Sequence, residues 1–181
     1  QPMADARGEI TVTYNGVVYN WRDLRRELEG LGHSFHTECA TEVLVEGWRA
    51  WGVGLLDRLE GMYAFAVHDG RTGQVLLARD RLGIKPLYWA EVDGTVLFAS
   101  EVRALLASGR LTAAPDRERV DAFLTLGYVP GERTFFEGIR KLRPGHALLV
   151  EGGAVRTWRT WDPARIQPVE LPYAEARAEL D

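Results

Sequence analysis

The first part of the chain alternates polar and apolar residues in the manner of a β-strand. Residues 9–14 (EITVTY) are enriched in β-branched side chains and lead directly into Asn15-Gly16. Asn-Gly is the strongest two-residue turn signal between apolar runs. The pattern therefore predicts a strand that enters a tight turn at Asn15-Gly16.

Apolar residues then recur at helical spacing in two segments, 21–31 and 43–51. Asn20 and Thr41 precede these segments, and each has a side chain that can accept a hydrogen bond from the backbone of a first helical turn. We expect two amphipathic helices, capped by Asn20 and Thr41.

The middle of the chain changes to short apolar runs separated by turn residues, which predicts strands. Asp69-Gly70 and Asp93-Gly94 are hairpin signals, so the sheet should be antiparallel. The expected strands are 62–68, 74–78, 87–90 and 96–99.

Two short helices and a last hairpin are expected after this sheet. Ser100 is suited to cap a helix through Leu106, and Pro115 is suited to open another through Leu126. Residues 146–161 form the hairpin in this interpretation. Helices placed around antiparallel strands indicate an α+β fold.

Composition and charge narrow the range of partners. The 181 residues include 22 basic and 26 acidic side chains, a net charge of -4, with no basic run that could follow a phosphate backbone. No apolar stretch approaches the roughly 18 residues that a membrane span requires. We expect neither nucleic-acid nor membrane binding, and the single Cys39 favours a reducing, cytoplasmic location.

A metal site is not expected. His33, His36 and Cys39 could offer ligands, but a closed zinc site needs four, and no second Cys/His pair follows. Polar loop residues explain these three side chains equally well, and Cys39 is interpreted as an idle thiol.

Several motifs follow one another in a fixed order: Gln1-Pro2, 14–20 (YNGVVYN), 32–35 (GHSF), 41–44 (TEVL) and 61–66 (GMYAFA). Together they resemble the N-terminal glutaminase domain of glutamine-hydrolysing asparagine synthetases, a class II glutamine amidotransferase domain. The resemblance continues through 79–88, 98–101, 127–130 and 141–146, which are characteristic of the asparagine synthetase branch.

The resemblance implies an Ntn-hydrolase-like fold, a four-layer αββα sandwich of antiparallel sheets. Residues 1–162 would be the glutaminase domain, lacking its N-terminal nucleophile segment, and residues 163–181 a linker and the start of a synthetase domain. ATP and Mg²⁺ would belong to that second domain, and no cofactor is expected in this chain. A homodimer is expected from the resemblance alone.

In the family an N-terminal cysteine attacks the glutamine amide, and its position lies upstream of the segment that matches Gln1-Pro2. We therefore expect this polypeptide by itself to release no ammonia from glutamine. Fixed hydrogen-bond donors must stabilise the developing oxyanion. The resemblance assigns this oxyanion hole to the side chain of Asn15 and the backbone N–H of Gly16.

The family positions that bind the α-ammonium group of glutamine are altered. The family has carboxylates where this sequence has Val17 and Ala40, while Glu42 matches the family's own glutamate. Leaving one member of a buried charge pair unmatched costs about 3 to 5 kcal/mol, so glutamine binding should be weak.

Two interpretations remain open. The chain is the glutaminase domain of an asparagine synthetase-like enzyme, or it is a vestigial, structural and dimer-forming domain, as in β-lactam synthetases and lasso-peptide cyclases. By the same resemblance, Met62 and Lys85 lie near the route by which ammonia leaves. Met62 is equally well explained as ordinary core, and Lys85 as a member of charge pairs in its loop.

Overall fold

A computed structural model describes residues 1–168 and 170–180, and these form a six-stranded and a three-stranded sheet, both antiparallel. The strands are β1 (Met3–Ala4), β2 (Ile10–Val18), β3 (Gly61–Asp69), β4 (Gln74–Arg79), β5 (Tyr88–Val92), β6 (Thr95–Ala99), β7 (Arg140–Lys141), β8 (His146–Glu151) and β9 (Ala154–Arg159). The larger sheet has the order β1-β2-β3-β4-β8-β9, and the smaller one β6-β5-β7.

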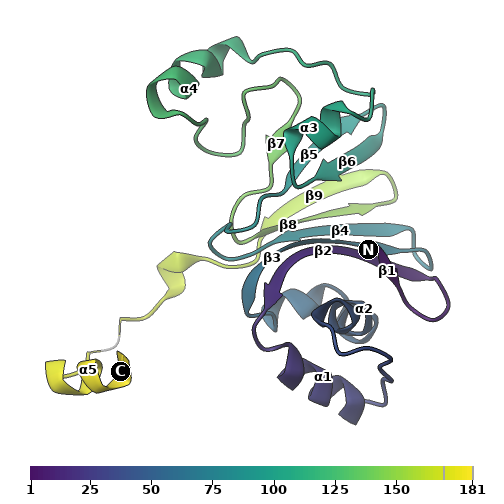
Figure 1. Ribbon diagram of the computed structural model, residues 1–181, viewed down its shortest axis with the longest axis vertical. Helices are drawn as coiled ribbons and strands as arrows, with labels where there is room; N and C mark the ends of the chain where they lie inside the picture. The colour runs from purple at the N-terminus through teal and green to yellow at the C-terminus, as the bar shows by residue number, and fades with distance from the viewer. Residues whose placement is uncertain (169, 181) are drawn as a thin grey trace.

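The helices lie before, between and after these strands. They are α1 (Trp21–Gly30), α2 (Ala40–Trp51), α3 (Val102–Leu106), α4 (Val120–Leu126) and α5 (Tyr173–Leu180), with 3-10 turns η1 (Gly52–Asp57), η2 (Arg117–Arg119) and η3 (Pro163–Arg165). Figure 1 shows α1 and α2 on one face of the larger sheet and the smaller sheet on the other.

Three groups of buried side chains join these layers. The largest lies between α1, α2 and the larger sheet and includes Leu28, Leu44 and Phe65. A second, with Leu77 and Trp89, joins the two sheets, and a third packs α3 against β5. The expected α+β sandwich with αββα layers is confirmed, because each sheet buries one face against the other sheet and one against helices.

The tight turn predicted at Asn15-Gly16 is wrong. Strand β2 continues to Val18, and β3 pairs with it residue by residue, with Gly16 opposite Tyr63. The turn signal fails here because a long-range strand partner is available on both sides of the Asn-Gly pair, and tertiary pairing overrides local preference.

The helices begin near the predicted residues but are capped differently. Asn20 precedes α1, yet its side chain bonds the main chain of Arg58 and Glu60 rather than the helix. Helix α2 starts at Ala40 with Cys39 in the capping position, so Thr41 lies inside the first turn. The two predicted caps are therefore wrong.

The later elements also start differently from the prediction. Glu101 and not Ser100 precedes α3, and residues 117–119 form a 3-10 turn before the short α4. The two-residue strands β1 and β7 were not predicted, since two residues carry no periodicity.

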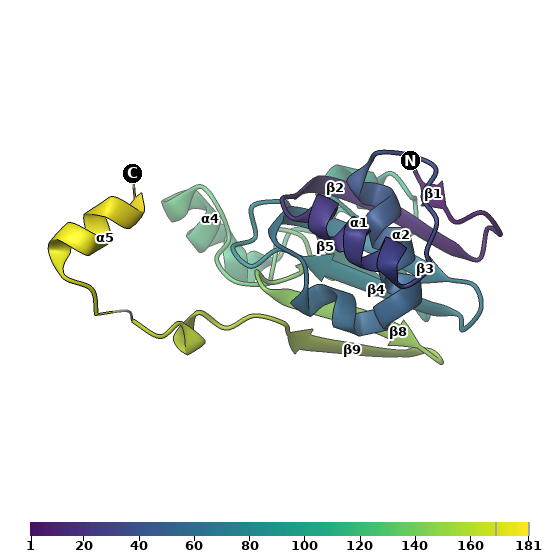
Figure 2. The ribbon, with the colours of Figure 1, turned by 90° about the horizontal axis from the view of Figure 1, so that it is seen from below.

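The C-terminal segment extends away from the two sheets. η3 and α5 follow β9, and α5 lies away from both sheets (Figure 1 and Figure 2). The division of the chain after residue 162 stays a prediction. Among the described residues, none of the helices combines the length and apolar character needed to cross a membrane.

Candidate functional site

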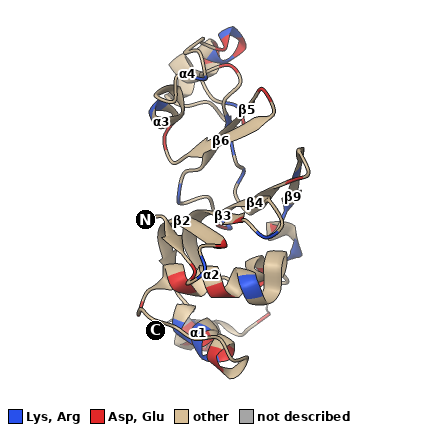
Figure 3. Cartoon of the chain, turned by 90° about the vertical axis from the view of Figure 1, so that its right-hand side faces the viewer, with Lys and Arg blue, Asp and Glu red and all other residues tan. Residues whose placement is uncertain are grey.

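Strand β2 carries the Asn15-Gly16-Val17 motif along the face of the sheet that looks toward the second sheet. Its buried residues Ile10, Val12 and Val18 face the helices, so the alternation of a strand turns Asn15 and Val17 to the opposite face. Both of these side chains are exposed. Figure 3 shows charged residues, coloured red and blue, along α1 and α2, whereas β2 and β3 are mostly uncharged.

Asn15 lines a cavity of about 280 Å³ between the two sheets. The other lining residues are Gln1, Thr13, Tyr14, Ala64, Phe65, Ala66, Leu87, Phe98, Ala99 and Ser100. A side-chain amide is thereby presented to a small, mostly apolar space, where a hydrogen bond is stronger than in water.

The Gly16 N–H points to the edge of β2 that lies away from β3. Gly70 N donates to Glu9 O and Tyr19 N to Glu60 O, so the odd-numbered residues of β2 bond to β3. The even-numbered residues bond to the other side, as the 2.7 Å bond from Tyr14 N to Gln1 Oε1 shows. Strand β1 pairs only with Thr11 and Val12, so it does not reach Gly16.

Gly16 also makes a close backbone approach to β3. A Cβ atom at Gly16 would lie 2.2 Å from the Met62 carbonyl oxygen, and one at Gly61 would lie 2.2 Å from the Val17 carbonyl oxygen. Both glycines have a φ angle near +150°. The close approach of the two paired backbones at the motif therefore requires glycine on each strand.

Glu42 is fully engaged at the start of α2. It is 8% exposed, and its carboxylate accepts hydrogen bonds from His36 N at 2.7 Å, Thr37 N at 2.7 Å and Thr37 Oγ1 at 2.5 Å. Burial opposes its ionisation, but these bonds outweigh it and hold the pKa of Glu42 below its usual value. Glu42 thus organises the loop before α2.

Ala40 and Val17 lie on different sides of β2. Ala40 packs against the core on the helix side, whereas Val17 is 46% exposed on the other face. Met62 is brought next to Val17 as its cross-strand partner and is half-buried. Neither Val17 nor Ala40 contributes a polar side chain to either surface.

Cys39 precedes α2 and is half-buried. Burial raises the pKa of its thiol, but hydrogen bonds from Thr37 and from the first turn of α2 outweigh this and lower it overall. The nearby Tyr14 hydroxyl is buried, and burial raises its pKa to about 12.

The segment after β4 forms an ordered loop rather than a solvated turn. Arg79 donates to the carbonyl oxygens of Gly83, Lys85 and Leu142, each at 2.7 Å. Asp80 is almost fully buried and accepts hydrogen bonds from the backbone of the same loop. Sequence reasoning treated this segment as one motif and did not single out Asp80, although an Asp in a turn commonly accepts a hydrogen bond from the backbone two residues on, as Asp80 does from Leu82.

Lys85 is half-buried at the end of this loop. Its main chain is fixed on both sides, since its N–H donates to Asp80 at 3.0 Å and its carbonyl accepts from Arg79. A role of Lys85 or Met62 on a route for ammonia stays a prediction.

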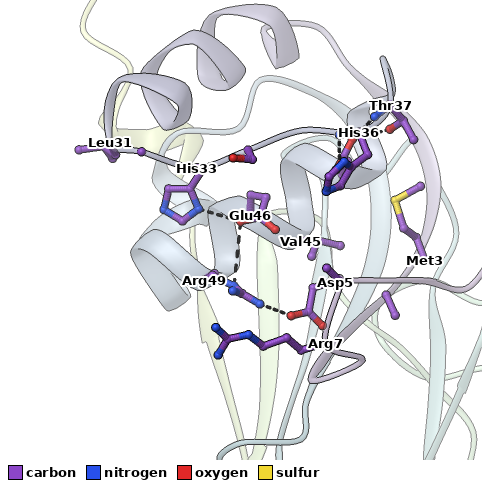
Figure 4. A pocket seen from close by; sticks show the side chains of 15 residues that line it. Met3, Asp5, Arg7, Leu31, His33, His36, Thr37, Val45, Glu46 and Arg49 are labelled. Carbon is purple, nitrogen blue, oxygen red and sulfur yellow. Dashed lines mark hydrogen bonds and ion pairs between the residues drawn. The ribbon is translucent and has the colours of Figure 1, made fainter.

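A larger cavity, of about 520 Å³, lies elsewhere, between β1, the end of α1 and α2 (Figure 4). Several of its charged side chains pair with one another: Arg49 binds Asp5, and His33 Nδ1 lies 2.7 Å from Glu46 Oε2, whereas Arg7 forms no ion pair with any described residue. Because most of these charges are paired within the protein, we interpret the cavity as a structural polar cleft. No group of three or more metal-ligating side chains occurs in the described residues.

Comparison with known protein families shows which family this domain belongs to. A family model described as a glutamine amidotransferase domain matches residues 1–161. The chain belongs to this family of glutamine amidotransferase domains. It is of class II and is homologous to the N-terminal glutaminase domains of asparagine synthetases.

Curated relatives of this amidotransferase domain include asparagine synthetase [glutamine-hydrolyzing] 3 of Bacillus subtilis, which is 39% identical over 90% of this chain and 27% of the relative. A putative asparagine synthetase [glutamine-hydrolyzing] of Mycobacterium tuberculosis is 36% identical over 78% of this chain and 22% of the relative. The chain thus spans about a quarter of the length of these relatives.

Among solved structures, the glutamine phosphoribosylpyrophosphate amidotransferase of Bacillus subtilis matches with a TM-score of 0.57. It is 22% identical to the amidotransferase domain, covering 89% of this chain and 32% of that one. At this identity the likeness supports the fold, and it agrees with the two-sheet architecture described above.

Proposed function

We propose that this domain hydrolyses the side-chain amide of glutamine and that the complete protein uses the released ammonia to form an amide, as its asparagine synthetase relatives are named for doing. ATP and Mg²⁺ belong, in this proposal, to a synthetase domain of the complete protein. A cysteine nucleophile attacks the amide carbon, ammonia leaves, and a glutamyl thioester forms and is then hydrolysed.

The direction of the Gly16 N–H carries this proposal. It points away from β3 at an edge of β2 that no described strand covers, and the neighbouring residue Asn15 has an exposed side chain. Donors held rigidly in this way stabilise an oxyanion without having to reorganise during the reaction. Gly16 is fixed by the close approach to β3, so the donor is set before substrate binds.

The resemblance assigns the α-ammonium group of glutamine to the positions of Val17 and Ala40, which lie on different sides of β2, and from their substitution we infer weak glutamine binding. Neither side chain can hold the α-ammonium group of the substrate, and the nearby Glu42 is committed to His36 and Thr37. The affinity lost should appear in KM, because the α-ammonium group is bound equally in the ground and transition states.

A vestigial domain is the alternative, and the relatives do not favour it. The curated relatives described above are named as glutamine-hydrolysing enzymes. In this proposal, Asn15 and Gly16 keep the oxyanion-hole motif, and Val17 and Ala40 alter positions that bind the substrate.

The proposal is tested with the complete native gene product by measuring glutamate formation over a range of glutamine concentrations. We expect saturable hydrolysis with a high KM. Asn15→Ala should lower kcat by about 100-fold, the usual effect of removing one oxyanion donor. Thr11→Ala, on the same face of β2, is the control and should leave kcat unchanged. A folded protein that releases no glutamate, or an Asn15→Ala variant as active as wild type, would contradict the proposal.

The binding defect is tested by restoring the carboxylates. Val17→Glu combined with Ala40→Asp should lower KM for glutamine about tenfold or more, since about 1.4 kcal/mol corresponds to a factor of ten. The neutral pair Val17→Gln with Ala40→Asn has nearly the same shape without the charge and should leave KM high. Equal KM values for both pairs would rule out the missing charges as the cause.

A further inference from the structure

Asp80 carries a buried carboxylate without a charged partner. It is 1% exposed, and among the described residues no Lys, Arg or His forms an ion pair with it. Its acceptors are instead filled by backbone N–H groups: Tyr63 at 3.2 Å, Leu82 at 3.1 Å, Ile84 at 3.0 Å and Lys85 at 3.0 Å.

One of these four bonds is different in kind. Leu82, Ile84 and Lys85 belong to the loop that Asp80 itself begins, whereas Tyr63 lies on β3. Asp80 N also donates to Tyr63 O at 2.8 Å. Asp80 therefore engages both main-chain polar groups of Tyr63 just beyond the end of β4, one with its backbone and one with its side chain.

Tyr63 is the residue directly opposite Gly16. Gly16 and Tyr63 are a pair without ladder hydrogen bonds to each other, so each turns its N–H and C=O away from the other: Tyr63 toward Asp80 and Gly16 toward the open edge of β2. Gly16 also rests on Tyr63, because a Cβ at Gly16 would lie 2.7 Å from the Tyr63 Cα. A displacement of the Tyr63 backbone would therefore displace the backbone of Gly16.

We propose that Asp80 is a positioning residue for the oxyanion hole: its buried carboxylate holds the Tyr63 main chain in place, and Tyr63, which Gly16 contacts closely, holds the Gly16 N–H in position. This inference rests on the proposed function, since an oxyanion hole matters only if glutamine is hydrolysed. Asp80 touches no substrate and acts through two backbone contacts. The loss of a well-aimed donor weakens the binding of the transition state more than the binding of the substrate.

The test is Asp80→Asn in the complete native gene product. Asparagine has nearly the same shape but turns one acceptor oxygen into an N–H₂ donor, so it cannot satisfy all four backbone donors. We expect kcat to fall about tenfold or more while KM for glutamine stays within about twofold, the pattern of an interaction made only in the transition state. Asp80→Glu, which keeps the charge but moves it, should show the same pattern and serves if Asp80→Asn does not fold.

Asp69→Asn is the matched control. Asp69 is also a buried aspartate of the same sheet, 2% exposed, and it accepts hydrogen bonds from Trp48 and Arg71 rather than from Tyr63. It should lower stability without changing kcat. Equal losses of kcat in the Asp69 and Asp80 variants would reduce Asp80 to a general structural role and overturn the proposal.

An NMR measurement separates this inference from the proposed function. In protein labelled with ¹⁵N-glycine, the Gly16 amide resonance should shift and exchange faster with solvent in Asp80→Asn, and should stay in place in Asp69→Asn. An unchanged Gly16 resonance in Asp80→Asn would overturn the link. Wild-type protein without glutamine hydrolysis would overturn the proposed function, while the Gly16 resonance still decides whether Asp80 sets this backbone.

Discussion

At the residue scale, side chains of the same chemical type have different roles because they have different hydrogen-bond partners. Asn15 presents its amide to the space between the sheets, whereas Asn20 uses its amide to join α1 to the segment before β3. Glu42 serves the loop before α2, and Asp80 serves the loop after β4. In each case the partner, rather than the residue type, decides whether the group is free for chemistry.

Glu42 gives a prediction about acid stability. Because its pKa in the folded state lies below the ordinary 4.5, its contribution to folding is present above about pH 4.5 and is lost as the pH falls through the folded pKa. Glu42→Gln should lower the free energy of unfolding at pH 7 by about 1 to 3 kcal/mol, because a buried N–H is left unsatisfied.

Urea unfolding at pH 7 and at progressively lower pH measures this effect. The difference between wild type and Glu42→Gln should shrink below pH 4.5, and the exposed neighbour Glu38→Gln should behave as wild type at every pH. A difference that is constant with pH would show that the Glu42 charge is not responsible.

At the element scale, the β2–β3 pair determines the geometry of the motif. Gly16 and Gly61 allow the two paired backbones to approach closely. Asp80 extends the pairing of β3 with β4 by one residue, because it bonds the main chain of Tyr63. The helices contribute indirectly, by burying the other face of β2. The site is thus built on strands, which hold donors more rigidly than loops do.

Gly61→Ala tests the close approach of β2 and β3. Its Cβ would lie 2.2 Å from the Val17 carbonyl oxygen, so a strand must move. Gly73→Ala is the control, since Gly73 also has a positive φ but no atom lies within 4 Å of the position that its Cβ would take. We expect Gly61→Ala to be less stable than Gly73→Ala by about 1 to 3 kcal/mol in thermal or urea unfolding. Equal stability of the two variants would contradict the claim that the close approach of β2 and β3 requires glycine at position 61.

Elements with a strong period could be predicted from the sequence, and those defined by long-range pairing could not. The periodicity located α1, α2 and the hairpin strands within a few residues. The turn predicted at Asn15-Gly16 was wrong, because β2 continues through these residues by pairing with β3, which is distant in sequence. The motifs identified candidate site residues, but the role of Asp80 depends on Tyr63, seventeen positions away in sequence, which no local pattern reveals.

At the scale of the whole molecule, two sheets packed face to face create the space beside Asn15, and helices close both outer faces. This architecture agrees with the family to which residues 1–161 belong. The chain covers about a quarter of its relatives, so the acceptor of the ammonia and the oligomeric state are matters for the complete protein. A synthetase domain and a homodimer remain proposals at this scale.

The most direct test of the central claim is the intact mass of the complete native gene product before and after incubation with 6-diazo-5-oxo-norleucine. This glutamine analogue alkylates an activated N-terminal cysteine. We predict a single adduct on that cysteine at high analogue concentration, with less analogue required for the Val17→Glu, Ala40→Asp variant. A folded protein that gains no adduct at any concentration would contradict a working glutaminase site.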